Sequence, residues 1–170
     1  MRAPMRSRLI LPLLLVAVVA ACARAPVPDP PRDAFATERA AEVLGFGFMA
    51  VHDRFIREVA VSHLGLEALR GLAALDPRIT AELERSRLSL RYAGEVIAEP
   101  PLPHKQDAEG WGALVAEATR AARRHSPVLA TASADSLYEA LFDSTLSSLD
   151  IYSRYAGPAE ADRHRDDRHG

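Results

Sequence analysis

Few residues of this 170-residue chain have the types and spacing that catalysis or metal binding needs. Its only cysteine is Cys22 and its only lysine is Lys105, which lies in a polar, proline-rich stretch where nothing would lower its pKa for use as a general base. The chain has no G-x-S-x-G, no H-E-x-x-H, no glycine-rich phosphate loop and no paired cysteines. We therefore predict no catalytic, cofactor-binding or metal-binding residue.

Two groups of polar residues have simpler explanations than catalysis or metal binding. The serines near the C-terminus fall in or beside a predicted helix, where capping and solvent exposure account for them: Ser136, Ser144, Ser147 and Ser148. The tail D-R-H-R-D-D-R-H-G contains His164 and His169 among aspartates that could bind a metal, but its arginines would repel a cation. We interpret the tail as a solvated linker.

Cys22 is the one residue with a specific chemical prediction. Arg2, Arg6 and Arg8 precede an almost continuous apolar run from Leu9 to Ala21, which is the pattern of a secretion signal and too short for a permanent span. The small residues before Cys22, in V-A-A-C, resemble the lipobox of bacterial lipoproteins, where the cysteine is acylated. We expect residues 1–21 to be the leader and Cys22 the lipid anchor. The alternative is that Cys22 is merely a small residue within a signal peptide or within an uncleaved membrane anchor.

Composition then divides the rest of the chain. Residues 22–32 are proline-rich and predict an extended tether, 33–158 a helical domain, and 159–170 a polar linker. The formal net charge is −2 with mixed signs, so no basic stripe indicates nucleic-acid binding. The leader and Cys22 predict a lipid-anchored location on the periplasmic side of a bacterial envelope, with the outer membrane as one destination because Ala23 is not an aspartate.

Helical periodicity dominates the domain, so we predict a mainly α fold, a helical bundle with one β-hairpin. The first apolar stripe runs from Ala40 to Val59; Gly45 and Gly47 on it indicate either a close helix crossing or a local break. Ser62 is expected to cap a second helix that ends at Asp76-Pro77. His52, beside the stripe, is interpreted as a partly buried or surface histidine rather than a catalytic one.

The later part of the domain shows a change of period. R-L-S-L-R-Y alternates, and Ala93-Gly94 predicts a turn into E-V-I-A; such a hairpin must lean on helices or pair with a sheet beyond this sequence. Asp107 should begin a third helix with Trp111 in the core, ending at Ser126-Pro127. Its basic end, Arg120 to His125, fits the helix dipole, with a phosphate or lipid-headgroup contact of Arg123 and Arg124 as the alternative.

The last helix is predicted from Ser136, whose pairing with Glu139 has the form of a capping box, and buries a stripe from Leu137 to Leu149. The stretch L-Y-E-A-L-F-D-S-T-L-S-S-L-D-I-Y-S-R-Y, ending in G-P-A-E, resembles the segment before the PDZ domain of carboxyl-terminal processing (tail-specific) proteases. The family shows Leu-Asp-Pro-(His or Tyr)-Ser-x-Tyr, which is matched by Leu149, Asp150, Tyr152, Ser153 and Tyr155, with Ile151 in place of proline. F-M-A-V-H-D-R-F-I-R-E-V-A, Phe48 to Ala60, looks like the family's first helix.

The resemblance implies the N-terminal scaffold or dimerisation domain of an exported serine endopeptidase that cuts C-terminal tails. The family's Ser/Lys dyad lies in a later domain, so the chain would be a fragment or truncated product, inactive alone, whose protein or peptide substrates need the missing domains. We expect homodimerisation through the helices between Asp33 and Leu75, because apolar faces can be shared between chains. The alternative is a stand-alone helical lipoprotein with a structural or adaptor role at the envelope.

Overall fold

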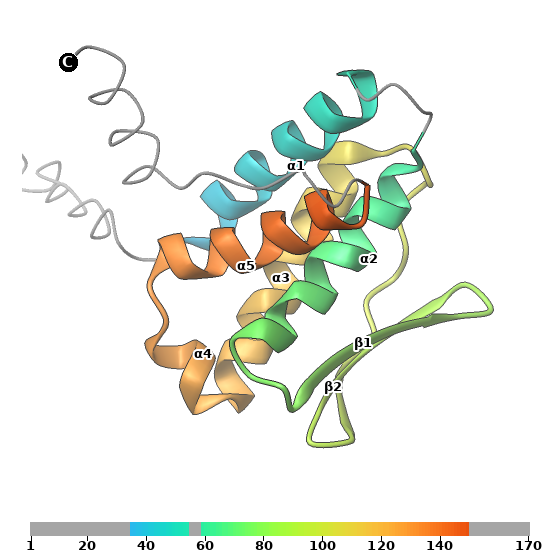
Figure 1. Cartoon of the computed structure of the whole chain (residues 1–170). Helices are drawn as coiled ribbons and strands as arrows, with labels where there is room; N and C mark the ends of the chain where they lie inside the picture. The colour runs from blue at the N-terminus through green and yellow to red at the C-terminus, as the bar shows by residue number, and fades with distance from the viewer. Residues whose placement is uncertain (1–34, 55–58, 150–170) are drawn as a thin grey trace, which may run out of the picture. The chain divides into compact units, whose positions relative to one another are not determined.

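Helix α2 lies at the centre of the domain and contacts α1, α3, α5 and β1 (Figure 1). The computed structural model describes residues 35–54 and 59–149, which belong to one compact unit, Pro31–Gly170. Its elements are α1 Thr37–Arg54, α2 Val61–Gly71, the 3-10 turn η2 Leu72–Ala74, strands β1 Ile79–Glu84, β2 Arg87–Tyr92 and β3 Glu95–Ala98, and helices α3 Ala108–His125, α4 Pro127–Thr131 and α5 Ala134–Ser147. The fold is mainly α, as predicted.

Helices α1 and α3 pack along much of their length and cross at their small residues. A Cβ added to Gly112 would lie 2.5 Å from both the carbonyl oxygen of Ala41 and the backbone nitrogen of Gly45. A Cβ on Gly45 would in turn lie 3.2 Å from the carbonyl oxygen of Ala108. The alternative left open by the sequence is therefore decided in favour of a close helix crossing, with α1 unbroken through Gly45 and Gly47.

The predicted extent of the first helix is too long. α1 ends at Arg54, residues 55–58 lie outside the described residues, and Val59 and Ala60 are not helical. The imidazole Nδ1 of His52 lies 2.7 Å from the carbonyl oxygen of Val59. Val59 packs against the core although it lies outside the helix, so apolar residues at helical spacing do not by themselves show that a helix continues.

The predicted cap of the second helix is wrong. The N-cap residue is Ala60, without a side-chain cap, and Ser62 lies inside the first turn. The free backbone N–H groups of that turn are satisfied from a distant loop: Val61 donates to the side-chain oxygen of Gln106 (3.2 Å) and Ser62 to the carbonyl oxygen of Lys105 (3.0 Å). Because the loop supplies the acceptors, no serine cap is needed.

Side-chain caps do begin the later helices. Asp107, which was predicted to begin the third helix, is the N-cap of α3, and its side chain accepts from the backbone N–H of Gly110 at 2.9 Å. The last helix starts earlier than predicted, because Ser133 accepts from the backbone N–H of Ser136 at 3.1 Å and so takes the capping role assigned to Ser136. Helix α3 ends where expected, at Ser126-Pro127, but the chain then forms the short helix α4.

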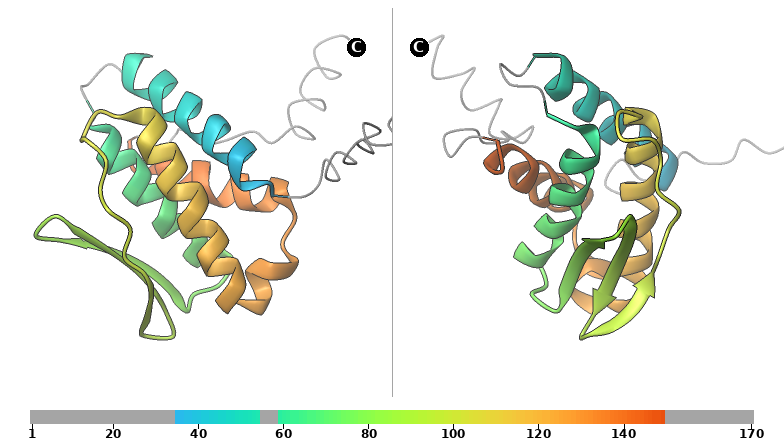
Figure 2. Two further views of the ribbon diagram at one scale, coloured as in Figure 1. Left: turned by 180° about the vertical axis from the view of Figure 1, so that it is seen from behind. Right: turned by 90° about the vertical axis from the view of Figure 1, so that its right-hand side faces the viewer.

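The sheet has three antiparallel strands in the order β1-β2-β3 and lies along one side of α2 and α3 (Figure 2). The predicted hairpin is β2 and β3, joined at Ala93-Gly94. The sequence reading missed β1, which pairs with all of β2 from Ile79 opposite Tyr92 to Glu84 opposite Arg87. The hairpin therefore leans on helices and also has a partner strand within this chain.

The core joins the helices to the buried side of the sheet. Its largest fully buried side chains are Trp111, Phe48, Leu44, Leu64, Leu69, Leu72, Ile79, Leu88, Leu90, Leu129, Leu137 and Leu141. Trp111 is the predicted core anchor: its ring packs against Gly65 of α2, and its indole N–H donates to the carbonyl oxygen of His104 at 3.1 Å. The glycine leaves room for the ring, and the carbonyl satisfies its one polar group.

Candidate functional site

The residues able to do chemistry are dispersed. Lys105 is exposed, and among the described residues no three histidine, cysteine, aspartate or glutamate side chains lie together as a metal site. Ser136 is hydrogen-bonded to Ser133, and Ser148 donates to the carbonyl oxygen of Thr145 at 2.7 Å, so both serve the ends of α5. Cys22, the tail histidines and the residues that match the protease motif after Leu149 lie outside the described residues.

The best-formed polar cluster joins Asp76, Arg78 and Ser126. Asp76 is 2% exposed; its carboxylate accepts from the Arg78 guanidinium through Nε and Nη2, both at 3.0 Å, and from the Ser126 hydroxyl at 2.6 Å. The Ser126 oxygen in turn accepts from the backbone N–H of Leu129 at 3.1 Å and begins α4. The Arg78 guanidinium also stacks on Tyr92, 4.9 Å from the ring centre. Every member has a partner within the cluster or beside it.

Electrostatics explain why Asp76 stays charged although it is buried. The Arg78 hydrogen bonds, followed by that from Ser126, hold the pKa of Asp76 well below its usual range, against the opposing effect of burial. Asp76 raises the pKa of Arg78 in return. A permanently ionised pair is suited to holding three segments together, namely the end of η2, the start of β1 and the start of α4. It does not suit a group that must exchange protons near neutral pH.

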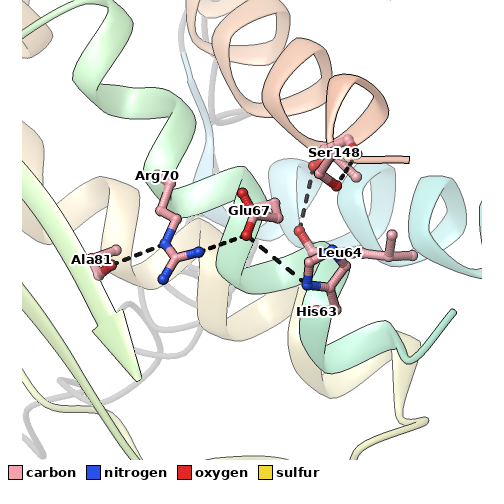
Figure 3. A network of polar contacts seen from close by, with 7 residues as sticks. His63, Leu64, Glu67, Arg70, Ala81 and Ser148 are labelled. Atoms are coloured by element: carbon pink, nitrogen blue, oxygen red, sulfur yellow. Dashed lines mark hydrogen bonds and ion pairs between the residues drawn. The ribbon is translucent and has the colours of Figure 1, made fainter. Parts of the chain in front are cut away.

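A second polar network runs along α2 and connects it to the sheet and to α5 (Figure 3). Arg70 donates to the carbonyl oxygen of Ala81 in β1 (3.3 Å) and to Glu67 (2.7 Å), which lies 4.0 Å from the imidazole of His63. On the α5 side, the Thr145 hydroxyl lies 3.4 Å from the carbonyl oxygen of Leu64. These contacts also fix elements to one another.

Arg123 likewise has a structural role. Its guanidinium donates to the carbonyl oxygens of Leu129 (3.0 Å) and Ala130 (3.1 Å) and lies 5.8 Å from the centre of the Phe35 ring. The last carbonyls of α4 thus occupy the donors that a phosphate would need. For Arg123 this geometry favours a structural role over the phosphate or lipid-headgroup contact considered from the sequence, whereas for the exposed Arg124 that contact stays a prediction.

Among residues 35–54 and 59–149, the outer face of α1 is the surface for which we find no structural role. Large apolar side chains are exposed there: Phe46 is 68% exposed, Met49 45% and Val43 39%. Arg39 and Asp53 are exposed at the two ends of the same face, and neither has an ion pair within the described part of the chain. We call these five residues the α1 face.

A groove of about 410 Å³ continues this surface onto α3. Phe46 and Met49 line it, together with small residues at the α1–α3 crossing and two acidic side chains: Ala41, Gly45, Ala108, Ala113, Glu42 and Glu109. Sequence reasoning missed this surface because it followed only the buried stripe of α1. A second stripe was visible, since Val43, Phe46 and Met49 recur at three-residue steps. The α1 face and the groove form the candidate functional site, and their chemistry is apolar binding.

No helix among the described residues is both long enough and apolar enough to cross a bilayer. Comparison with known proteins finds no matching family model, no similar curated protein and no similar solved structure.

Proposed function

We propose that residues 33–158 are the non-catalytic helical scaffold domain of a carboxyl-terminal processing protease of the bacterial envelope. The observation that carries the proposal is the α1 face with its groove: a compact domain that exposes large apolar side chains on one helix is suited to binding protein. The choice of family rests on the resemblance of the stretch from Leu149 to Tyr155 to the family's motif. Export and membrane attachment rest on the leader and Cys22.

In this proposal each segment of the chain has a separate role. The lipid at Cys22 and the proline-rich residues 22–32 hold the domain near the membrane, and residues 159–170 lead toward a PDZ domain. Recognition and cleavage of a substrate's C-terminal tail belong to the PDZ and Ser/Lys domains. The helical domain positions them, and alone it cleaves nothing.

The coding sequence after codon 170 tests the proposal most directly. A PDZ-like region followed by a Ser/Lys site supports it, and unrelated sequence there contradicts it. A biochemical test is cleavage of peptides with apolar C-termini by the purified chain, for which we expect no turnover. Turnover by this chain alone would overturn the proposal, because it would place the catalytic residues within these 170 residues.

One observation favours the alternative of a stand-alone helical lipoprotein with an adaptor role. The sheet obtains its third strand, β1, from the domain itself, so the hairpin does not need strands from elsewhere to be stable. The two proposals share the binding surface and the anchor, and they differ only in whether protease domains follow.

A further inference from the structure

We propose that the groove between α1 and α3 binds a basic amphipathic helix of another protein. The apolar stripe of that helix lies on Phe46 and Met49, and its lysine or arginine side chains lie beside Glu42 and Glu109. The inference deepens the proposed scaffold function, on which it rests, by naming the chemistry of the partner at the same site.

The first argument is the shape of the groove. Figure 2 shows α1 and α3 side by side, and small residues of both helices, Gly45 and Ala108 among them, line the space where the helices meet. Phe46 and Met49 line the same space and are 68% and 45% exposed. An apolar side chain of a partner can therefore enter between large apolar side chains and reach the small residues beneath. The flexible thioether of Met49 lets the wall adjust to the side chain that enters.

Backbone hydrogen bonding favours a helical partner over an extended one. The groove is lined by residues of α1 and α3, whose backbone N–H and C=O groups pair within their own helices away from the ends. An extended chain in the groove would leave its own backbone polar groups unpaired where water is excluded, whereas a helix satisfies them internally. Docking of an amphipathic helix through apolar residues three and four positions apart is a recurring mode of recognition.

The second argument is the charge of the groove. Among the described residues, the charged side chains that line it are Glu42 on α1 and Glu109 on α3, so a carboxylate lies on each of the two helices. Glu38 is exposed one turn before Glu42. None of the three has an ion pair within residues 35–54 and 59–149. Cations on both borders of an apolar stripe would give these carboxylates partners.

Basic side chains of the domain do not neutralise this rim. At about 100° per residue around α1, Glu42 lies on the side that faces α3, as the other groove residues of α1 do. On the same count Arg54 lies on the opposite side, and Arg39 lies along the outermost line of the helix. On α3, Arg120 donates through Nε to Glu117 at 2.8 Å, so its charge is already compensated.

The same charges disfavour two other occupants. A second copy that paired groove to groove would bring Glu42 and Glu109 of one chain toward the same carboxylates of the other, and like charges across an interface oppose binding. An anionic membrane surface attracts basic segments and would repel this rim. The basic amphipathic helix is the occupant that satisfies both the apolar surface and the carboxylates.

Binding of a designed peptide to the full chain in non-ionic detergent tests the proposal. The probe is a fluorescent peptide of about 18 residues, built on alanine, with leucines along one helical face and lysines on both borders of that face. The control peptide has glutamate at every lysine position. Fluorescence anisotropy, with protein-free micelles as the blank, should show saturable binding of the lysine peptide and none of the glutamate peptide.

Phe46→Ser tests the apolar part of the site. We expect it to weaken binding of the lysine peptide about ten-fold, because exposed aromatic side chains at the centre of an interface are common anchors. Val96→Ser is the matched control, since Val96 is 45% exposed but lies on β3, and it should leave binding unchanged. Circular dichroism checks that both variants keep the fold.

The double variant Glu42→Gln, Glu109→Gln tests the charges. It should weaken binding several-fold and make it less sensitive to added salt, because exposed charge pairs are screened by ions. Glu95→Gln with Glu99→Gln removes two exposed carboxylates from the other side of the domain and should change neither property.

Four results would overturn the proposal. They are absence of lysine-peptide binding, equal binding of the two peptides, binding that Phe46→Ser leaves unchanged, and binding that the double glutamine variant leaves unchanged. Sedimentation of the same samples identifies the rival occupant: self-association that Phe46→Ser abolishes, without peptide binding, would assign the surface to a second copy.

The outcome is separable from that of the proposed function. If no protease domain follows codon 170 but the lysine peptide binds as expected, the protease proposal fails and the partner assignment stands. If protease domains follow but the peptide does not bind, the partner assignment alone fails.

Discussion

Asp76 shows how one carboxylate can hold three elements together. The pKa of Asp76 is lowered chiefly by the Arg78 guanidinium and then by the Ser126 hydroxyl. The native state therefore binds fewer protons at this site than the unfolded chain, in which an aspartate has a pKa of about 3.9. The resulting stability is fully present above that value and is lost as pH falls below it toward the native pKa.

This linkage gives a prediction for Asp76→Asn. At pH 7 the variant should unfold at a clearly lower denaturant concentration than the wild type, because the amide cannot accept the charge-assisted bonds of Arg78. Between pH 5 and about pH 2 the two midpoints should converge, since only the wild type loses a carboxylate contribution. Urea unfolding followed by circular dichroism measures both. A difference between the two chains that stays constant across this range would contradict the role given to Asp76.

Thr119 makes the opposite case, a buried polar atom that stabilises nothing. Its side chain is fully buried in α3, and its hydroxyl is the one buried side-chain oxygen or nitrogen without a hydrogen bond in the described part of the chain. An unsatisfied buried hydroxyl costs roughly 1–3 kcal/mol. Valine has nearly the same shape without that hydroxyl.

We accordingly expect Thr119→Val to raise the free energy of unfolding by about 1 kcal/mol, which is measurable as a higher midpoint in urea. Thr145→Val is the matched control. Thr145 is equally buried in α5, but its hydroxyl donates to the carbonyl oxygen of Leu141 at 2.8 Å. The control should therefore lower stability or leave it unchanged, and a gain of similar size in both variants would refute the explanation.

At the scale of elements, the β-turns account for the strand that the sequence analysis missed. Ile79, Ala81 and Leu83 alternate as a strand should, but the turn after them is Arg85-Ser86, and both residues have positive φ, 45° and 66°. This conformation is one that asparagine and glycine favour, so its usual sequence signal is absent. The next turn, Ala93-Gly94, contains a glycine and was predicted from the sequence. Strand periodicity without turn chemistry was not enough to identify β1.

Replacing Arg85-Ser86 with Asn-Gly should stabilise the domain by about 1 kcal/mol, because each ordinary residue held in the left-handed region costs roughly 1 kcal/mol or more. Gly94→Ala is the contrasting change. Gly94 has φ 87° and open space around its Cα, so alanine meets only backbone strain and should destabilise by about 1 kcal/mol. Thermal or urea unfolding measures both. The account fails if the two substitutions shift stability in the same direction.

Helix positions followed more readily from the sequence than helix ends did. Asp107 at the start of α3 and Ser126-Pro127 at its end carry local signals, and both were predicted. The start of α2 carries none, because its acceptors come from Gln106 and Lys105, more than forty residues away. The hydrogen bond between Asp76 and Ser126 also joins residues fifty positions apart and likewise has no local sequence signal. Contacts made across the fold set these features, and neighbours in the sequence do not reveal them.

At the scale of the whole molecule, we expect folding of the domain and membrane attachment through Cys22 to be independent of each other. The described helices and sheet close a core among themselves, and the predicted anchor is a single side chain near the start of the chain. Membrane attachment by acyl chains is additive, at about 0.8 kcal/mol per buried CH₂ group, and needs nothing from the folded domain. Removing the anchor should therefore change where the chain is found and leave its fold intact.

Cys22→Ser tests this separation in a bacterial host. We expect the wild-type chain to incorporate labelled palmitate and to lose its leader, and the variant to remain unlabelled and unprocessed, because serine has no thiol to acylate. Ala25→Ser, three residues further on, should be labelled and processed normally. Both variants should resist proteolysis through residues 35–149 as the wild type does. Label retained in Cys22→Ser would refute the assignment of the anchor, and proteolysis of its helical domain would refute the independence of fold and anchor.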